Sequence, residues 1–312
     1  MTTCLVTGGA GFIGSHIVDA LVVRGDRVRV LDNLSSGHRE NLSQVIDRID
    51  FIEGDLRDEA VVAKATQGVD YIFHLAAMVS VPESMDNPLE AEQINALGTL
   101  NLLTAAKAAG VKRLVLSSTC AVYGDEPTLP KVETMPTFPQ SPYAISKLTA
   151  EMYCQLFTDS FGQEATILRY FNVFGPRQDP SSAYSGVISI FVDRLSQNIA
   201  PVIFGDGEQT RDFVFVKDVV RANLLAAATP GAAGQMFNIG TGRQVTINHL
   251  FASLCDIFDL ELQAHYKPGR VGDIRYSYAD PSLAKKVLGW SAQVSFEDGL
   301  LRQLVEKIRA IR

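Results

Sequence analysis

Tyr143 and Lys147 are the residues of this 312-residue sequence whose types and spacing most directly suggest chemistry. They stand four positions apart, and Ser141 and Pro142 before them are suited to cap and begin a helix, so both side chains should share one helix face. A phenol with a pKa of about 10 is a poor base at neutral pH, but a lysine cation beside it stabilises the phenolate and lowers that pKa. The pair therefore predicts a proton acceptor of the kind that works beside a hydride acceptor.

A glycine-rich turn near the N-terminus predicts a binding site for that hydride acceptor. Gly8, Gly11 and Gly14 follow a short apolar run and precede a helical pattern. In this arrangement the glycines allow a tight turn, close approach of a pyrophosphate and close helix–strand packing, and the helix N-terminus attracts the anion. Asp32, 18 residues after Gly14, is placed to bind ribose hydroxyls and to repel a 2′-phosphate, and Asn33 rather than arginine follows it. We therefore predict NAD rather than NADP.

A run of hydroxyl side chains, Ser117-Ser118-Thr119, follows an apolar segment over residues 114–116. It would lie at the carboxyl end of a strand, where parallel sheets bind ligands. One hydroxyl could bond a reacting substrate oxygen and share its proton with the tyrosine. We expect Ser117 to satisfy backbone groups, so Ser118 and Thr119 both remain candidates. Cys120 is expected to be a small packed residue rather than a nucleophile.

The elements that must position these residues alternate along the first half of the chain. Strands and helix-length segments in turn are typical of right-handed crossovers in a parallel sheet. We predict an α/β fold, a Rossmann-type doubly wound parallel sheet with a smaller mixed α/β substrate-binding lobe at the C-terminal side. The predicted strands are residues 4–6, 27–32, 49–53, 71–75, 114–117 and 165–168, and the predicted helices are residues 12–24, 89–109 and 142–161.

In the second half of the chain, strand and helix patterns alternate less regularly. A Ser/Gly/Pro-rich stretch at 179–186 leads to a helix and then to an apolar run at 201–206. Residues 213–228 and 236–239 again have the patterns of a helix and a strand, so we expect the chain to return to the first sheet. We predict an NAD-binding domain over residues 1–174 with a return segment at about 213–242, and a substrate lobe over 175–212 and 243–312.

Composition excludes several classes of function. A formal charge of −7 leaves no basic excess for a nucleic-acid surface. The four cysteines lie far apart without metal or disulfide spacing, so no metal site and reduced thiols are expected. No stretch approaches the roughly 18 uninterrupted apolar residues of a membrane span. A soluble, cytoplasmic protein is expected.

Together these features resemble the extended short-chain dehydrogenase/reductase family, and within it the UDP-hexose 4-epimerases. The resemblance covers nearly the whole chain, through TGGAGFIGSH at the start, DNLSSG after the second strand, HLAA at 74–77, SSTCAVYGD at 117–125, SPYAISK at 141–147, RYFNVFGPRQDP at 169–180, GDGEQTRDFVFVKDV at 205–219 and ADPSLAKKVLGW at 279–290. In that family NAD stays bound while hydride leaves sugar C4 and returns to the opposite face of a 4-keto sugar. The resemblance therefore implies a UDP-sugar substrate and a net isomerisation.

The resemblance also assigns roles to individual residues. It implies that Tyr143 is the base, that Lys147 holds this tyrosine and the nicotinamide ribose, and that Thr119, with Ser118 as the neighbouring alternative, is the catalytic hydroxyl. Asn172, Arg211 and Arg270 match residues that bind the diphosphate, Asp273 matches an acid that contacts the uridine ribose, and residues 201–204 would border the uracil. The predicted cofactor-binding set is Gly8, Gly11, Phe12, Ile13, Gly14, Asp32, Asn33, Ser35, Ser36, Gly37, Asp55, Leu56, Leu75, Ala76, Ala77, Asn95, Ser117, Tyr143, Lys147, Tyr170 and Val173. The predicted substrate-binding set is Ser80, Thr119, Tyr143, Asn172, Val187, Ile203, Phe204, Arg211, Arg270, Asp273 and Ser277.

One departure from the family pattern bears on the sugar. Four residues after Asp273, epimerases specific for UDP-glucose tend to carry a bulky tyrosine, and here Ser277 occupies that position. A small side chain should leave space for a 2-acetamido group, so we predict that UDP-GlcNAc and UDP-GalNAc are accepted as well as UDP-Glc and UDP-Gal. The segment RYFNVFGPRQDP followed by Ala183-Tyr184 also resembles the acetamido-sugar branch.

Three alternatives remain beside the epimerase prediction. Nucleotide-sugar 4,6-dehydratases usually place Asp-Glu directly after the catalytic threonine, where this chain has Cys120-Ala121. UDP-glucuronate decarboxylases usually have a glutamate at the position of Ala121. A non-catalytic NAD-sensing module would be expected to lose Tyr143 or Lys147, and both are present. The family commonly dimerises through a four-helix bundle, for which the helices over 89–109 and 142–161 are the candidates.

Overall fold

The structure is a computed structural model that describes residues 1–179, 186–269 and 274–311. Its centre is a seven-stranded sheet in the order β11-β6-β5-β4-β1-β2-β3, and every neighbouring pair is parallel. The order reverses beside β1, as in a doubly wound sheet. The predicted Rossmann-type α/β fold is confirmed. The strands are β1 Thr3–Thr7, β2 Arg27–Asp32, β3 Ile49–Glu53, β4 Tyr71–His74, β5 Arg113–Thr119, β6 Glu164–Tyr170 and β11 Met236–Ile239.

Helices cover both faces of this sheet because its strands are apolar on both sides. Helices α1 and α8 contact each other on one face. On the opposite face α2 packs against α5, and α5 packs against α6. Adjacent strand residues divide between the two layers: Leu5 belongs to the core with α5 and α6, whereas Val6 belongs to the core with α1 and α8. The helices of these layers are α1 Phe12–Arg24, α2 Glu59–Thr66, α5 Gly98–Ala109, α6 Pro142–Phe161 and α8 Val216–Ala228.

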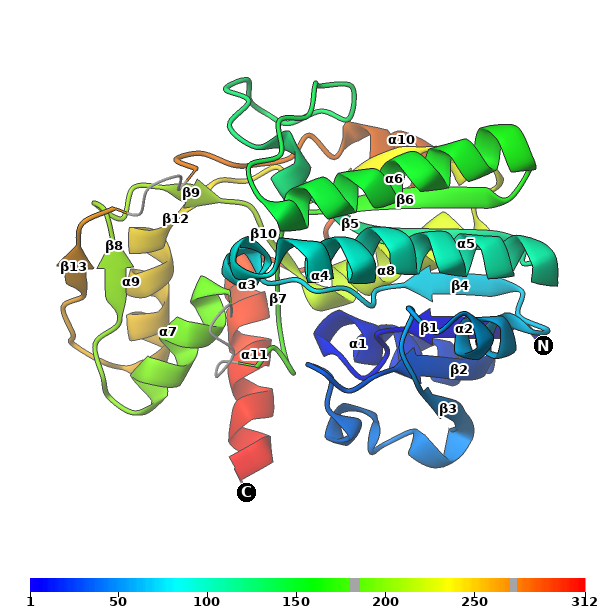
Figure 1. Cartoon of the computed structure of the whole chain (residues 1–312). Helices are drawn as coiled ribbons and strands as arrows, with labels where there is room; N and C mark the ends of the chain where they lie inside the picture. Colours follow the sequence, from blue (N-terminus) through cyan, green and yellow to red (C-terminus); the bar gives the residue numbers. More distant parts are fainter. Residues whose placement is uncertain (180–185, 270–273, 312) are drawn as a thin grey trace.

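A smaller group of elements gathers at one side of the molecule, where α7, α9, β8 and β13 lie at the left of Figure 1. They share a third core of mainly aliphatic residues, in which several aromatic side chains, including Phe174, Phe191 and Phe213, are also buried. Strand β8 pairs with β13 in parallel, and β9 pairs with β12 in antiparallel. The elements are α7 Val187–Ser196, β8 Val202–Phe204, β9 Thr210–Arg211, β12 Val245–Thr246, α9 Ile247–Phe258, β13 His265–Lys267 and α11 Phe296–Ile311.

The remaining short elements connect these layers. They are α3 Val81–Asp86, α4 Pro88–Glu92, α10 Ser282–Leu288 and the 3₁₀ turns Arg39–Leu42, Ile46–Arg48, Cys120–Tyr123 and Pro230–Ala232. In the part of the chain that the structure describes, no helix combines the length and the apolar character needed to cross a bilayer.

Two segments differ from the sequence-based expectation. The helix expected over residues 89–109 is α4 followed by a π-helical turn, Gln93–Leu97, and then α5. The helix expected over 213–228 begins only at Val216, because Phe213–Phe215 form strand β10 and pair in parallel with β7, Asn172–Phe174. Phe174 of β7 and Phe213 and Phe215 of β10 are buried. Each strand pairs with a partner 41 residues away, which local periodicity does not reveal.

Candidate active site

The glycine turn forms a cradle suited to a diphosphate. Gly8 has φ +67°, and a Cβ on it would lie 2.6 Å from the backbone nitrogen of Ala76, so only glycine fits against this loop. A Cβ on Gly14 would lie 2.1 Å from the carbonyl oxygen of Gly8. Helix α1 begins after Gly11 with no side-chain cap and no acid in its first turn. Its first N–H groups can therefore bind an anion, and this cradle fits NAD.

Asp32 lies beside this cradle at the end of β2. Its carboxylate accepts hydrogen bonds from the backbone N–H groups of Ala10 at 2.9 Å and Leu34 at 2.8 Å. A Cβ on Gly37 would lie 2.9 Å from the same carboxylate, so the following loop packs closely over it. Because a carboxylate can accept about four hydrogen bonds, Asp32 keeps lone pairs for ribose hydroxyls.

The ends of β2 and β3 are joined through Asn33, which donates a hydrogen bond to Asp55 at 2.9 Å. A hydrogen bond from Arg57 is the main cause that holds the pKa of Asp55 well below its usual range. Ser35 donates its backbone N–H to Asn33. Leu56, predicted as a cofactor contact, is buried in the core beneath this edge.

Asn95 holds the loop that follows β4. Its oxygen accepts from the backbone of Met78 at 2.8 Å, and its amide donates to the Met78 carbonyl and to Ser146 Oγ. Asn95 lies in the π-helical turn, and such turns often occur at functional sites. Leu75 and Ala76 of the same loop border the glycine turn. Ser80 ends the loop as the buried N-cap of α3, where its hydroxyl accepts from Glu83.

Tyr143 and Lys147 lie on the first turns of α6, which Ser141 caps by accepting a hydrogen bond from Ala144. Burial raises the pKa of Tyr143 to about 12, and a hydrogen bond with the Thr119 side chain acts in the opposite direction. Burial also lowers the pKa of Lys147 to about 8. The surroundings thus oppose both charged forms, and a phenolate here needs a cation beside it.

The three consecutive hydroxyls at the end of β5 have three different partners. Ser117 Oγ shares a hydrogen bond with the phenol of Tyr170 at 2.9 Å, rather than with the backbone as expected. Ser118 Oγ donates to Glu151 at 2.5 Å. Thr119 is the hydroxyl beside Tyr143, and it also accepts from the backbone of Ala121 at 3.1 Å. Different partners thus separate the two candidates, because Ser118 is engaged with Glu151 and Thr119 with Tyr143.

A cavity of about 210 Å³ opens at Cys120 and Ala121, the residues that directly follow Thr119. It brings together Asn172, Arg211 and Ser277, which the sequence analysis had placed in one substrate site from three distant segments. Arg211 donates to the backbone carbonyls of Thr210 and Ile274 at 2.8 and 2.7 Å. The complete lining is Cys120, Ala121, Tyr123, Gly124, Lys131, Asn172, Arg211, Ile274 and Ser277.

Sequence reasoning did not assign six of the nine lining residues to the site: Cys120, Ala121, Tyr123, Gly124, Lys131 and Ile274. Burial raises the pKa of the Cys120 thiol to about 11, against a hydrogen bond with Ser277, so Cys120 is a neutral wall residue. Lys131 reaches the cavity because its backbone pairs with Tyr278 and Asp280 on a distant segment. Its proximity to Ser277 depends on this tertiary pairing, and the Pro130-Lys131 sequence carries no signal for it.

The other predicted residues are spread around the site. Phe12 and Ile13 begin α1, Ser36 and Ala77 lie in loops after β2 and β4, Val173 follows Asn172 in β7, Val187 begins α7, and Ile203 and Phe204 lie in β8. Arg270, Asp273, Ala183 and Tyr184 lie outside the described residues.

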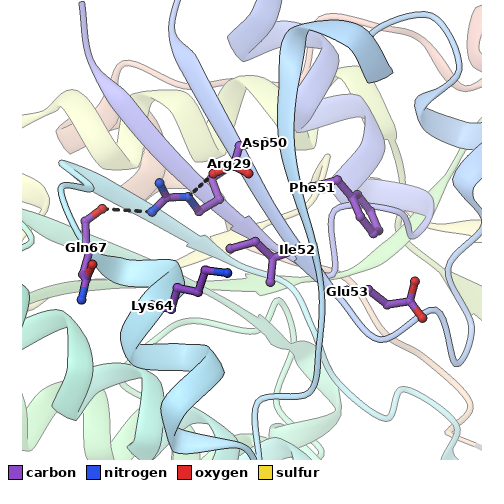
Figure 2. A pocket seen from close by; sticks show the side chains of 7 residues that line it. All are labelled: Arg29, Asp50, Phe51, Ile52, Glu53, Lys64 and Gln67. Carbon is purple, nitrogen blue, oxygen red and sulfur yellow. Dashed lines mark hydrogen bonds and ion pairs between the residues drawn. The ribbon is translucent and has the colours of Figure 1, made fainter.

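A second hollow, of about 530 Å³, lies against the edge strand β3 (Figure 2). In the sheet order, β4, β1 and β2 separate β3 from β5, which carries Thr119. Two of its charged side chains pair with each other, since Arg29 lies 2.7 Å from Asp50, and Arg29 also donates to the Gln67 backbone carbonyl at 2.9 Å. The mixed charges and the absence of a glycine turn among its lining residues distinguish it from the cofactor cradle.

Comparison with known proteins places this site in a defined context. Residues 4–240 match the model of the NAD dependent epimerase/dehydratase family. A UDP-glucose 4-epimerase of Mycolicibacterium smegmatis is 40% identical over 96% of both chains. UDP-glucuronic acid decarboxylase 1 of Arabidopsis thaliana is 36% identical over 96% of this chain and 68% of its own length.

Solved structures show the same range of relatives. The UDP-glucose 4-epimerase of Thermotoga maritima with UDP-glucose superposes with a TM-score of 0.95 at 43% identity, covering 100% of both chains. A UDP-N-acetylglucosamine 4-epimerase of Methanobrevibacter ruminantium, in complex with UDP-N-acetylmuramic acid, has a TM-score of 0.95 at 40% identity and covers 99% of both chains. The dTDP-glucose 4,6-dehydratase DesIV of Streptomyces venezuelae has a TM-score of 0.92 at 34% identity over 99% of this chain and 98% of its own.

Replacing Gly14 by alanine should weaken NAD binding at least about tenfold, equivalent to about 1.4 kcal/mol. The new Cβ would lie 2.1 Å from the Gly8 carbonyl oxygen, so α1 must move away from the turn. NAD affinity, measured by calorimetry or by nucleotide released on acid precipitation, checks this. Gly231→Ala is the matched control, because Gly231, like Gly14, has no positive φ and its added Cβ would meet only a side-chain carbon of Val287 at 3.9 Å. Wild-type NAD affinity in Gly14→Ala would contradict the assignment of the cradle.

Proposed function

Because the chain belongs to the NAD dependent epimerase/dehydratase family and its cofactor is NAD, we propose that it interconverts UDP-hexoses at C4 through a transient 4-keto sugar. One observation carries the choice of epimerisation. Among the described residues that line the cavity at Cys120 and Ala121, none is a carboxylate, and these two residues directly follow Thr119. Elimination of water across C5–C6 needs an acid and a base at this place. Proton removal at C4 needs only Tyr143 and its hydroxyl partner.

In the proposed reaction, Tyr143 accepts the 4-hydroxyl proton and later returns it to the sugar. When bound, NAD supplies the acceptor, and afterwards the donor, of the C4 hydride. Thr119 bonds the reacting oxygen, because its hydroxyl lies beside the phenol, whereas Ser118 is engaged with Glu151. Lys147 provides the cation that the buried phenolate requires.

The two parts of the chain would hold the two ligands. We assign NAD to residues 1–174 with the return segment 213–242, and the UDP-sugar to 175–212 and 243–312. Asn172 and Arg211, at the cavity, would bind the diphosphate together with Arg270, because a guanidinium suits a phosphate oxygen pair. Asp273 would contact the uridine ribose. Val187, Ile203 and Phe204 would border the uridine. All four cysteines are free thiols, which supports a reducing, cytoplasmic setting.

The function is tested by incubating the purified protein, without added NAD, with UDP-Glc, UDP-Gal, UDP-GlcNAc and UDP-GalNAc separately. We expect C4 epimers as the products, and NMR or chromatography of the sugar nucleotides identifies them. Parallel incubations with dTDP-glucose and UDP-glucuronate test the two alternatives. A 6-deoxy-4-keto product from dTDP-glucose would support the dehydratase, and a pentose product from UDP-glucuronate would support the decarboxylase. No turnover of any nucleotide sugar despite bound NAD would support a sensing module.

Two variants test the assigned hydroxyl within the same assay. Thr119→Val should lower turnover by roughly 10²-fold, the scale of one acid–base contribution. Ser118→Ala, the matched loss of the adjacent hydroxyl, should lower it less because Ser118 Oγ bonds to Glu151. A larger loss in Ser118→Ala would reverse the assignment.

Ser277 should decide whether a 2-acetamido sugar is accepted. It lines the cavity beside Cys120, and both side chains are small. Ser277→Tyr should lower kcat/KM for UDP-GlcNAc and UDP-GalNAc at least about tenfold, equivalent to about 1.4 kcal/mol, and should spare UDP-Glc and UDP-Gal. Ser277→Ala is the control that removes the hydroxyl without filling the space. Unchanged acetamido-sugar turnover in Ser277→Tyr would refute the pocket argument.

We also infer that the protein forms a homodimer through α4, α5 and α6. These helices contact one another, yet they leave several large apolar side chains exposed, which is typical of an interface. On α4 and the π-helical turn these are Leu89 and Leu97, and on α6 they are Ile145, Met152 and Leu156. A pair of helices from each of two copies would bury this apolar surface in a four-helix bundle.

Met152→Glu should convert the dimer to a monomer in light scattering, because the 64% exposed methionine would place a charge inside the bundle. Val23→Glu is the matched control, since Val23 is 83% exposed on α1, away from this surface. A wild-type protein that elutes as a monomer would contradict the dimer, and an intact dimer in Met152→Glu would place the interface elsewhere.

A further inference from the structure

A buried charge cluster lies behind the Tyr143–Lys147 pair. Its centre is Glu151 on α6, which is 2% exposed and bonds to residues of two strands. Arg169 on β6 donates through Nε and Nη2 to the two carboxylate oxygens at 3.0 and 2.7 Å. Ser118 on β5 donates to the first of these oxygens at 2.5 Å. Residues of the sheet therefore hold the carboxylate, and neither Arg169 nor Ser118 lines the substrate cavity.

Arg169 is itself fixed at the far end of this cluster. Its guanidinium carbon lies 4.7 Å from the ring centre of Tyr123, in cation–π geometry. The phenol of Tyr123 donates to Asn238 of β11 at 2.7 Å. The clamp on Glu151 thus extends over the neighbouring strands β5, β6 and β11, and the carboxylate has little freedom to change its position.

Lys147 stands one helical turn before Glu151, so both side chains point along the same face of α6. The lysine is 4% exposed, and burial lowers its pKa. The charge of Glu151 is the largest influence that raises the pKa of Lys147 again. The other titratable groups near Lys147 do not replace this charge. Burial lowers the pKa of His74 on β4 to about 3 and raises the pKa of Cys154, so both are neutral.

We propose that Glu151 is a positioning residue, clamped by Arg169 and Ser118, that keeps Lys147 charged and directed toward Tyr143. The inference rests on the proposed function, which assigns Tyr143 and Lys147 to the proton transfer. The hydrogen bonds from Arg169 and Ser118 determine how Glu151 acts on Lys147. A free carboxylate would form a direct pair with Lys147 and draw the ammonium away from the phenol. A carboxylate already bonded to Arg169 supports the lysine charge from a fixed distance.

The test measures the phenolate of Tyr143 directly in the NAD-bound protein. Ultraviolet difference absorbance is followed during a pH titration, and the part of the signal missing in Tyr143→Phe belongs to Tyr143. In Glu151→Gln, which keeps the shape and one acceptor oxygen, Lys147 should lose its proton more readily. The phenolate midpoint should then rise by about one pH unit, about a tenfold loss of phenolate near neutral pH. The acid limb of the kcat profile should shift with it, while KM stays near the wild-type value.

A matched control is available on the same two strands. Arg113 of β5 and Glu164 of β6 form another arginine–glutamate pair, with nitrogen and oxygen 2.7 Å apart, at the strand ends remote from Tyr143. Glu164→Gln should leave the phenolate midpoint unchanged. If Glu151→Gln does not fold, Glu151→Asp replaces it, with a smaller rise expected because the carboxylate is withdrawn by one methylene.

An unchanged midpoint in a folded, NAD-bound Glu151 variant would overturn the proposal. A shift of equal size in Glu164→Gln would also overturn it, because the effect would then be a general response to a lost ion pair. The titration needs no substrate, so its result is separate from the proposed function. Wild-type epimerisation with an unchanged midpoint would reject only the role of Glu151, whereas absent epimerisation would reject the proposed function.

Discussion

All seven strands of the central sheet run in the same direction, and this constraint determines where the site can be. Every loop that leaves a strand at its carboxyl end emerges at one edge of the sheet. The glycine turn follows β1, Asp32 ends β2, Leu75 follows β4 and Thr119 ends β5. Residues separated by more than a hundred positions therefore meet without any long-range signal between them.

The same parallel arrangement creates the main electrostatic difficulty of the site. A sheet covered on both faces buries whatever lies at its centre, and α6 carries Tyr143 and Lys147 into this region. Burial disfavours the phenolate and the ammonium, both of which the proposed proton transfer requires. The fixed carboxylate of Glu151 and the charge of bound NAD are the compensating features. The two neighbouring hydroxyls at the end of β5 contact different parts of α6, because Ser118 bonds to Glu151 and Thr119 to the phenol of Tyr143.

The sequence was sufficient for features that depend on local pattern. Periodicity located the strands of the sheet to within about two residues, and the Gly8–Gly14 spacing located the cradle. It was insufficient where a distant partner decides the local structure. Strand β10 forms from Phe213 because β7 offers a parallel partner, and a segment read alone as helix gives no hint of this.

The cavity shows the same limit at the level of single residues. Asn172, Arg211 and Ser277 were found by resemblance, and the structure brings them together. Lys131 was missed because a backbone bridge to Ala279 brings it to the cavity. The partnership of Glu151 with Arg169 was missed for a related reason. The position of Glu151 on its helix was visible in the sequence. The pairing of β5 with β6, which places Arg169 opposite Glu151, was not visible.

A C4 epimerase must let one sugar present both faces to the same nicotinamide, and the residues that line the cavity suit this requirement. Arg211 suits the diphosphate, which in the proposed reaction must stay in place while the 4-keto sugar turns. Cys120, Ala121 and Ser277, in the same lining, are small, and the thiol is held neutral by burial. A carboxylate here would favour one orientation through hydrogen bonds and would also offer a route to elimination. Small, weakly bonding side chains avoid both effects, so the feature that argues against a lyase also suits a sugar that has to rotate.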